Sequence, residues 1–252
     1  MIKIIKDMSL LTPLIWILII LPIIIIALVK SEKGKLKYLA FFILYFLADC
    51  YIQQLSRAYF SLDFLGLKFT WIGKILSLAV SLIIIYSVSK SDRQEIGFTT
   101  KTNSKEQVKT GLLFFFGFLL FDLIFKMILF PKGGHFDLET FTFQATMPGL
   151  TEEIAFRGIS LWLLDKLFIP KWTFKGVKFG WGFIIVTLLF GVVHGVFLTE
   201  NHAFKFDIMT IVYLTLISSL SVGILRKLSG NLIYSALAHN TINVLNAIIR
   251  IL

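Results

Sequence analysis

The segment TEEIAFR, residues Thr151 to Arg157, places two carboxylates and a guanidinium within an apolar part of a very hydrophobic chain. A charged side chain at membrane depth costs at least about 2.5 kcal/mol on insertion scales, so three of them within six residues require an explanation. On a helix, Glu153 and Arg157 are i,i+4 neighbours and can pair, whereas Glu152 is rotated by about 100° and keeps a free carboxylate. The structural alternative to a chemical role is a salt bridge that locks two helices together.

The chain as a whole has the composition of a membrane protein. Of its 252 residues, 57% are hydrophobic and 16% are charged, and the mean hydropathy is +0.84. Strand signals are negligible, and lipid admits only helices or closed barrels. We therefore expect an all-α, polytopic transmembrane bundle of about eight helices. The apolar runs of suitable length are 10–29, 38–55, 71–88, 108–130, 146–168, 180–198, 208–225 and 231–249.

The net charge of +10 does not indicate nucleic-acid binding, because the Lys and Arg residues lie in short loops between apolar runs. The loops after the first, third, fifth and seventh runs are the richest in these residues, as cytoplasmic loops are. The positive-inside rule therefore predicts that both termini and the loops around Lys132 and Lys205 lie outside. The single cysteine, Cys50, excludes an intrachain disulfide and is expected to be a buried, inert thiol.

A polar segment, SKSDRQEIGFTTKTNSKEQ at 89–107, divides the chain into N-terminal helices over 1–88 and a helical core over 108–252. Its composition predicts an exposed linker or an interfacial hairpin. Within the apolar runs, Asp122 and Lys126 are expected to pair at i,i+4 spacing, and Asp49 is expected to make a hydrogen bond between helices. The run with the acidic segment is expected to begin near Thr146, with Pro148 close to its first turn.

Two of the four histidines lie within apolar runs, whereas His135 and His202 fall in loops and are expected to be solvated. His194 shares a helix face with Phe190, and the flanking glycines Gly191 and Gly195 permit close approach of a neighbouring helix.

His239 shares a face with Asn243 in the last run. Together with the free carboxylate of Glu152, these side chains have the chemistry for hydrolysis. Glu152 can take a proton from water, while His194 and His239 hold that water or ligate a divalent metal that acidifies it. Asn243 can donate its amide N–H to the oxyanion of a tetrahedral intermediate.

Three spaced motifs on separate helices resemble those of the CPBP family of intramembrane proteases. The motifs are Glu152-Glu153-x-x-x-Arg157, Phe190-x-x-x-His194 and His239-x-x-x-Asn243. That family includes the CAAX prenyl endopeptidases of eukaryotes and the bacterial Abi proteins linked to bacteriocin processing and self-immunity. The resemblance covers about residues 108–252 and implies an active site among the last five helices. No family motif is evident before Ser89.

The resemblance implies a role for each motif residue. Glu152 matches the catalytic glutamate that activates water, and Glu153 and Arg157 match the flanking pair that supports it. His194 and His239 match the histidines of the site. A zinc or other divalent ion would take Glu152, His194 and His239 as ligands; the alternative is activation of the water by the glutamate and histidines alone.

The resemblance also implies an oxyanion-stabilising role for Asn243, a protein or peptide substrate, and a multi-pass protein of the bacterial plasma membrane in contact with the lipid bilayer. Two other functions are compatible with the same residues. One is a non-catalytic immunity or scaffold protein that uses the polar cluster for helix packing. The other is a proton-coupled transporter with Glu152 as the carrier, although the internal repeat typical of transporters is not evident.

Overall fold

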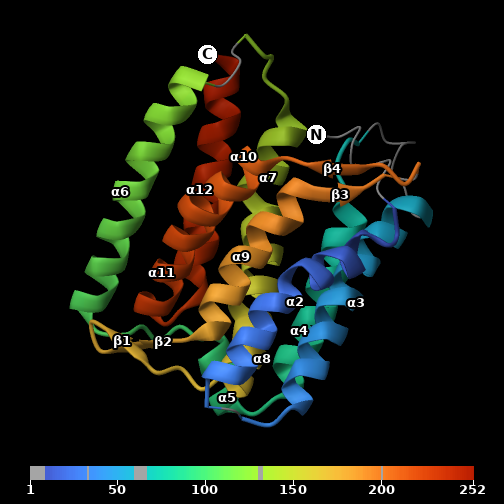
Figure 1. Ribbon diagram of the computed structural model, residues 1–252. Helices are drawn as coiled ribbons and strands as arrows, with labels where there is room; N and C mark the ends of the chain where they lie inside the picture. Colours follow the sequence, from blue (N-terminus) through green and yellow to red (C-terminus); the bar gives the residue numbers. More distant parts are fainter. Residues whose placement is uncertain (1–8, 33, 60–66, 130–132, 200) are drawn as a thin grey trace.

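The computed structural model describes residues 9–32, 34–59, 67–129, 133–199 and 201–252, and it is an all-α helix bundle (Figure 1). Within these residues, each of the eight apolar runs forms a helix. Four single helices precede or flank the site: α2 (Thr12–Lys30), α3 (Lys37–Tyr59), α4 (Trp71–Ser87) and α6 (Lys105–Leu129). The last part of the bundle contains α9 (Trp181–Gly195), α12 (Leu232–Ile251) and two longer, composite helices.

Each composite helix contains a π-helical segment. The first consists of α7 (Leu138–Glu152), the π-helix η2 (Glu153–Ser160) and α8 (Leu161–Leu167), and the second of α10 (Ile208–Tyr213), η3 (Leu214–Ser219) and α11 (Leu220–Ser229). In the described residues, five helical segments are long and apolar enough to cross a membrane. They are Thr12–Lys30, Lys37–Ser56, Lys105–Leu129, Ile208–Ser229 and Leu232–Ile251. The predicted polytopic bundle is thus confirmed.

The start of the helix with the acidic segment differs from the sequence prediction. The helix begins at Leu138, not near Thr146, because the Asp137 side chain caps it by accepting the backbone N–H of Thr140 at 3.2 Å. Pro148 consequently lies inside the helix instead of near its first turn. The composite helix has 15 residues up to Glu152 and then 8 and 7 more in η2 and α8, so Glu152 lies near its middle.

Two short β-hairpins and a short helix lie between the long helices. Residues 196–198, at the end of the apolar run 180–198, form a strand and do not continue the helix as predicted, because α9 ends at Gly195. Strand β1 (Trp172–Phe174) pairs antiparallel with β2 (Val177–Phe179), and β3 (Val196–Leu198) pairs with β4 (Phe204–Phe206). The three-residue strands are too short for a periodic signal in the sequence. The polar segment 89–107 contains helix α5 (Lys90–Ile96) and no hairpin. In this helix, hydrogen bonds from Ser89 and Lys166 keep the pKa of the Asp92 carboxyl below its usual range.

One contact within a helix and one between helices confirm the structural roles predicted for the isolated polar residues. Asp122 and Lys126 form a buried ion pair of 2.6 Å in α6. Asp49 of α3 accepts a hydrogen bond from Ser77 of α4, which joins these two helices. Cys50 is a free thiol but is half-buried, not fully buried as predicted, because it lies on a side of α3 that the other helices only partly cover.

The two ends of the bundle are chemically different. The connections from α2 to α3, α4 to α6, α8 to α9 and α11 to α12 gather at one end, together with α5 and the β1–β2 hairpin (Figure 1). Hydrogen bonds tie this end together, including the one from the Gly34 N–H to the Leu167 carbonyl at 2.7 Å. The C-terminus, β3 and β4 lie at the opposite end (Figure 1). The four Lys- and Arg-rich loops predicted to share a side therefore do so.

Candidate active site

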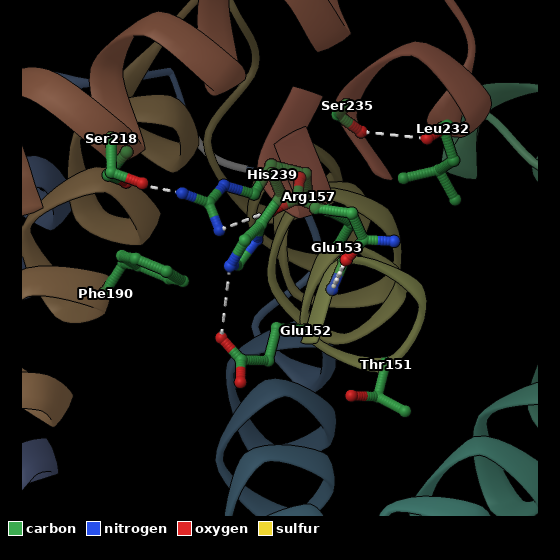
Figure 2. Close-up of polar contacts among 12 residues, drawn as sticks. Thr151, Glu152, Glu153, Arg157, Phe190, Ser218, Leu232, Ser235 and His239 are labelled. Carbon is green, nitrogen blue, oxygen red and sulfur yellow. Dashed lines mark hydrogen bonds and ion pairs between the residues drawn. The ribbon is translucent and has the colours of Figure 1, made fainter. Parts of the chain in front are cut away.

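Three of the predicted site residues meet near the middle of the bundle. Glu152 at the end of α7 directs Oε2 toward Nε2 of His194 in α9 at 3.7 Å, and toward Nε2 of His239 in α12 at 3.9 Å. In Figure 2 the Glu152 carboxylate faces His239 from below. The side chain of His194 is 32% exposed, whereas those of Glu152 and His239 are 17% and 6% exposed. Access to the cluster is therefore greatest beside His194.

The hydrogen bonds of the two histidines determine which ring nitrogen carries the proton. His194 Nδ1 lies 2.7 Å from the carbonyl oxygen of Phe190, which can only accept, so Nδ1 must donate. His239 Nδ1 lies 2.8 Å from Oε1 of Glu153, an acceptor as long as that carboxylate is ionised. In neutral rings, both Nε2 atoms then carry lone pairs. Glu152 Oε2, His194 Nε2 and His239 Nε2 are consequently three hydrogen-bond acceptors that face one another, with no donor among them.

A second layer of contacts holds His239 in place (Figure 2). Arg157 donates to Oε1 of Glu153 at 3.0 Å, which confirms the predicted i,i+4 pair, and it also donates to Ser219 Oγ at 2.8 Å. The guanidinium of Arg157 lies 4.0 Å from the ring centroid of Phe190, a cation–π contact. Glu153 and Arg157 are almost completely buried, at 0% and 2% exposed. This buried network fixes the ring of His239 through Glu153.

Both π-helical segments contribute to this network. Segment η2 begins at Glu153 and includes Arg157, and η3 ends at Ser219. A π-helical turn changes the direction in which the following side chains point, and such turns are frequent at functional sites. The sequence predicted ordinary α-helices here, because no residue pattern distinguishes a π-helical turn from an α-helical one.

The prediction that Glu152 keeps a free carboxylate is wrong. Lys74 of α4 donates to Oε1 of Glu152 at 2.8 Å, and the two side chains are only 12% and 17% exposed. Sequence analysis missed this residue, although a lone lysine inside the apolar run 71–88 has the intramembrane charge that could have indicated a site residue. The site therefore includes a residue from the N-terminal helices, in addition to the last five.

Two asparagines of α12 that flank His239 on its C-terminal side, Asn240 and Asn243, have different surroundings. Asn240 accepts the backbone N–H of Gly149 at 2.7 Å and donates to the Thr146 carbonyl at 3.3 Å, so it fastens α12 to α7 just before Glu152. Asn243 lies one turn beyond His239 and is half-buried. Its side chain makes no hydrogen bond to the described residues, so its amide N–H groups are available. The loop histidines His135 and His202 are exposed, as predicted, and neither belongs to the cluster.

The donor chemistry of the cluster resembles that of a metal site, but its charge and spacing do not fit one. In the described part of the chain, no three His, Cys, Asp or Glu side chains form a group that could hold a metal ion. The Lys74 ammonium lies 2.8 Å from Oε1 of Glu152 and would repel a divalent cation on the same carboxylate. With Lys74 in place, Glu152, His194 and His239 therefore do not form a fitting zinc site.

Comparisons with known proteins agree with the motifs. Residues 134–245 match the family model described as type II CAAX prenyl endopeptidase Rce1-like. Comparisons with curated proteins and with solved structures found no match. The matched segment spans α7 to most of α12 and contains all three motifs, whereas Lys74 lies outside it. The family predicted from the three motifs is thus confirmed, since residues 134–245 match the Rce1-like family of type II CAAX prenyl endopeptidases.

Proposed function

We propose that this multi-pass membrane protein is an endopeptidase in which Glu152 activates the water that hydrolyses a peptide bond. The observation that supports the proposal most directly is the convergence of Glu152 Oε2 and the two Nε2 atoms, at 3.7 and 3.9 Å. These distances are too long for direct hydrogen bonds. A water can donate one hydrogen to the carboxylate and the other to an imidazole, which satisfies acceptors that otherwise face one another.

The reaction follows from the placement of these groups. Glu152 takes a proton from the water as the water oxygen attacks the carbonyl carbon of the peptide bond. The resulting oxyanion accepts hydrogen bonds from donors such as the amide of Asn243, which the half-buried position one turn from His239 makes available. The carbon–nitrogen bond then breaks, and the proton held by Glu152 passes to the nitrogen of the leaving amine. Glu152 ends as a carboxylate.

The substrate proposed first is a protein or peptide tail with a prenylated CAAX sequence, because this is the substrate class in the name of the matching family. The lipid part of such a tail partitions into the bilayer, so it can bring the peptide bond to a membrane-embedded site. The greater exposure of His194 than of Glu152 and His239 favours an approach of the peptide from the α9 side.

The test uses the full-length protein reconstituted in liposomes and a fluorescence-quenched CAAX peptide, prenylated or not. Glu152→Gln should lower cleavage at least about a hundredfold, because the amide keeps the volume of the side chain but loses the base. The control is Glu106→Gln, which changes a glutamate that is 80% exposed at the start of α6. Retention of more than about a tenth of the activity by Glu152→Gln contradicts its role as the base. No cleavage by the wild type would favour the scaffold function.

A further inference from the structure

We propose that Lys74, supplied by the N-terminal helix α4, is a positioning residue of the hydrolytic site that holds Glu152 in the orientation needed to activate water. This inference rests on the proposed function. Lys74 binds Oε1 of Glu152 at 2.8 Å, which leaves Oε2 as the oxygen that faces His194 and His239. A carboxylate fixed through one oxygen presents the other in a defined direction.

The charges of the buried cluster support this role. Glu153 is paired with Arg157 at 3.0 Å, and Glu152 is paired with Lys74 at 2.8 Å, so each of these two glutamates has its own cation. Without Lys74, Glu152 would be a second carboxylate beside Glu153 with only one guanidinium nearby. Burying an unpaired carboxylate is strongly unfavourable, and the ammonium of Lys74 offsets that cost.

The neighbouring contacts of α4 hold Lys74 on the face that reaches the site. Ser77 lies three residues after Lys74, on the same helix face, and donates to Asp49 of α3. Gln53, one turn after Asp49, also donates to Asp49, at 2.9 Å. The Ser77–Asp49 bond fastens the Lys74 face of α4 to α3, and the bond from Gln53 holds Asp49 in place from within α3. Asp49 interacts electrostatically with Lys74 and Glu152 as well.

Lys74 also accounts for the poor fit of a divalent metal. Its ammonium supplies, at Oε1 of Glu152, the positive charge that a metal ion would otherwise provide. The site is therefore larger than the segment 134–245, since the N-terminal helices provide one of its charged groups.

The first arm of the test measures the pair without using activity. The melting temperatures of the wild type, Lys74→Met, Glu152→Gln and the double variant form a double-mutant cycle. Lys74→Met should lower the melting temperature in the wild-type background, and by less than half as much in the Glu152→Gln background. An equal decrease in both backgrounds means that the two side chains are not coupled, and it overturns the inference whether or not the protein cleaves peptides.

The second arm measures kcat and KM for the peptide. Lys74→Met should lower kcat about a hundredfold with little change in KM, because a misplaced catalytic group costs about that factor. Lys74→Arg keeps the charge and should recover at least a tenth of the wild-type kcat. The matched control is Lys126→Met, which breaks another buried pair, between side chains that are each 1% exposed, away from the site. It should lose stability but keep its kcat per folded molecule.

The two arms separate this inference from the proposed function. If the Lys74→Met variant has the kcat of the wild type, the positioning role is overturned, whereas the proposed endopeptidase function is unaffected. If the wild-type protein cleaves no peptide, both the endopeptidase function and the positioning role are contradicted. The double-mutant cycle of melting temperatures still reports whether Lys74 and Glu152 pair.

Discussion

Glu153 is the residue on which the second layer of the site depends. Its Oε1 accepts from Arg157 at 3.0 Å and from His239 at 2.8 Å, so it joins η2 to α12. Its Oε2 is buried without a hydrogen-bond partner in the described structure. A carboxylate in this position is stable only while its cation is present, because a buried charge without a partner is strongly destabilising.

Arg157→Ala should therefore damage the fold as well as catalysis. Removing one partner of a buried pair costs about 3–5 kcal/mol in soluble proteins, and here it also removes the donor to Ser219. Replacing Glu153 and Arg157 together by apolar residues of similar size should recover part of the stability but none of the activity, because His239 loses its acceptor. Denaturant titration in detergent measures the difference, with Lys109→Ala at an exposed position of α6 as the control. Equal unfolding midpoints for Arg157→Ala and the wild type would contradict the pairing.

Contacts within one helix could be predicted from the sequence, whereas contacts between distant helices could not. The pairs Glu153–Arg157 and Asp122–Lys126 follow from i,i+4 spacing alone. Lys74 and Glu152 are 78 residues apart, and their pairing depends on how α4 packs against α7. Nothing in the spacing of the apolar runs determines that packing. The histidines were identified because a polar ring in an apolar run is itself unusual.

At the scale of elements, α9 positions His194 by packing closely against the second composite helix. A Cβ atom added at Gly191 would lie 2.6 Å from the Ile211 carbonyl oxygen and would also clash with Thr215 Oγ1. One added at Gly195 would lie 2.8 Å from the Asp207 carbonyl oxygen. The close approach predicted from these two glycines is thus confirmed. The π-helical segment η3, against which α9 packs, could not be predicted.

Gly191→Ala should push α9 away from η3 and displace His194, which lies less than one turn further along. We expect a loss of about 1–3 kcal/mol of stability, as for overpacked cores, and a fall in activity that exceeds the unfolded fraction. Gly117→Ala in α6 is the matched control, because a Cβ atom there meets nothing within 4 Å. It should be neutral or stabilise the helix by up to about 1 kcal/mol. Similar effects of the two substitutions on stability and cleavage would show that the α9 contact does not position His194.

At the scale of the whole molecule, the asymmetry of charge between the two ends indicates its orientation in the membrane. The Lys and Arg residues of the end with α5 and the β1–β2 hairpin are, among the described residues, Lys30, Lys35, Lys37, Lys90, Arg93, Lys101, Lys105, Lys109, Lys166, Lys171, Lys175, Lys178, Arg226 and Lys227. Among the residues whose side chains are described, the opposite end has Lys68, Lys205 and Arg250, together with Lys126 in the last turn of α6, which is buried and paired with Asp122. The loop around Lys132 was also predicted to lie outside; Lys132 is not among the described residues. The positive-inside rule places the basic end in the cytoplasm.

The position of the site along the bundle changes what this orientation implies for the substrate. With the predicted helix start near Thr146, Glu152 would lie near the start of its helix, toward the side predicted for the loop around Lys132, which is the outer side. Because the helix begins at Leu138, 15 residues lead up to and include Glu152, and 15 more follow in η2 and α8. The site consequently lies about midway between the ends, so a substrate anchored in either leaflet has a similar distance to travel.

Cysteine labelling tests the orientation. In a Cys50→Ala background, Lys205→Cys in β4 and Lys101→Cys in the loop before α6 each introduce one thiol at an exposed position of opposite ends. A membrane-impermeant maleimide applied to intact cells should label Lys205→Cys at once and Lys101→Cys only after permeabilisation, because the charge bias puts the basic end in the cytoplasm. The reverse pattern would invert the topology, with the α5 end outside and both the C-terminus and the β3–β4 hairpin in the cytoplasm. Activity measured in the same two variants checks that neither thiol disturbs the mid-membrane site, since both positions lie in connections away from Glu152.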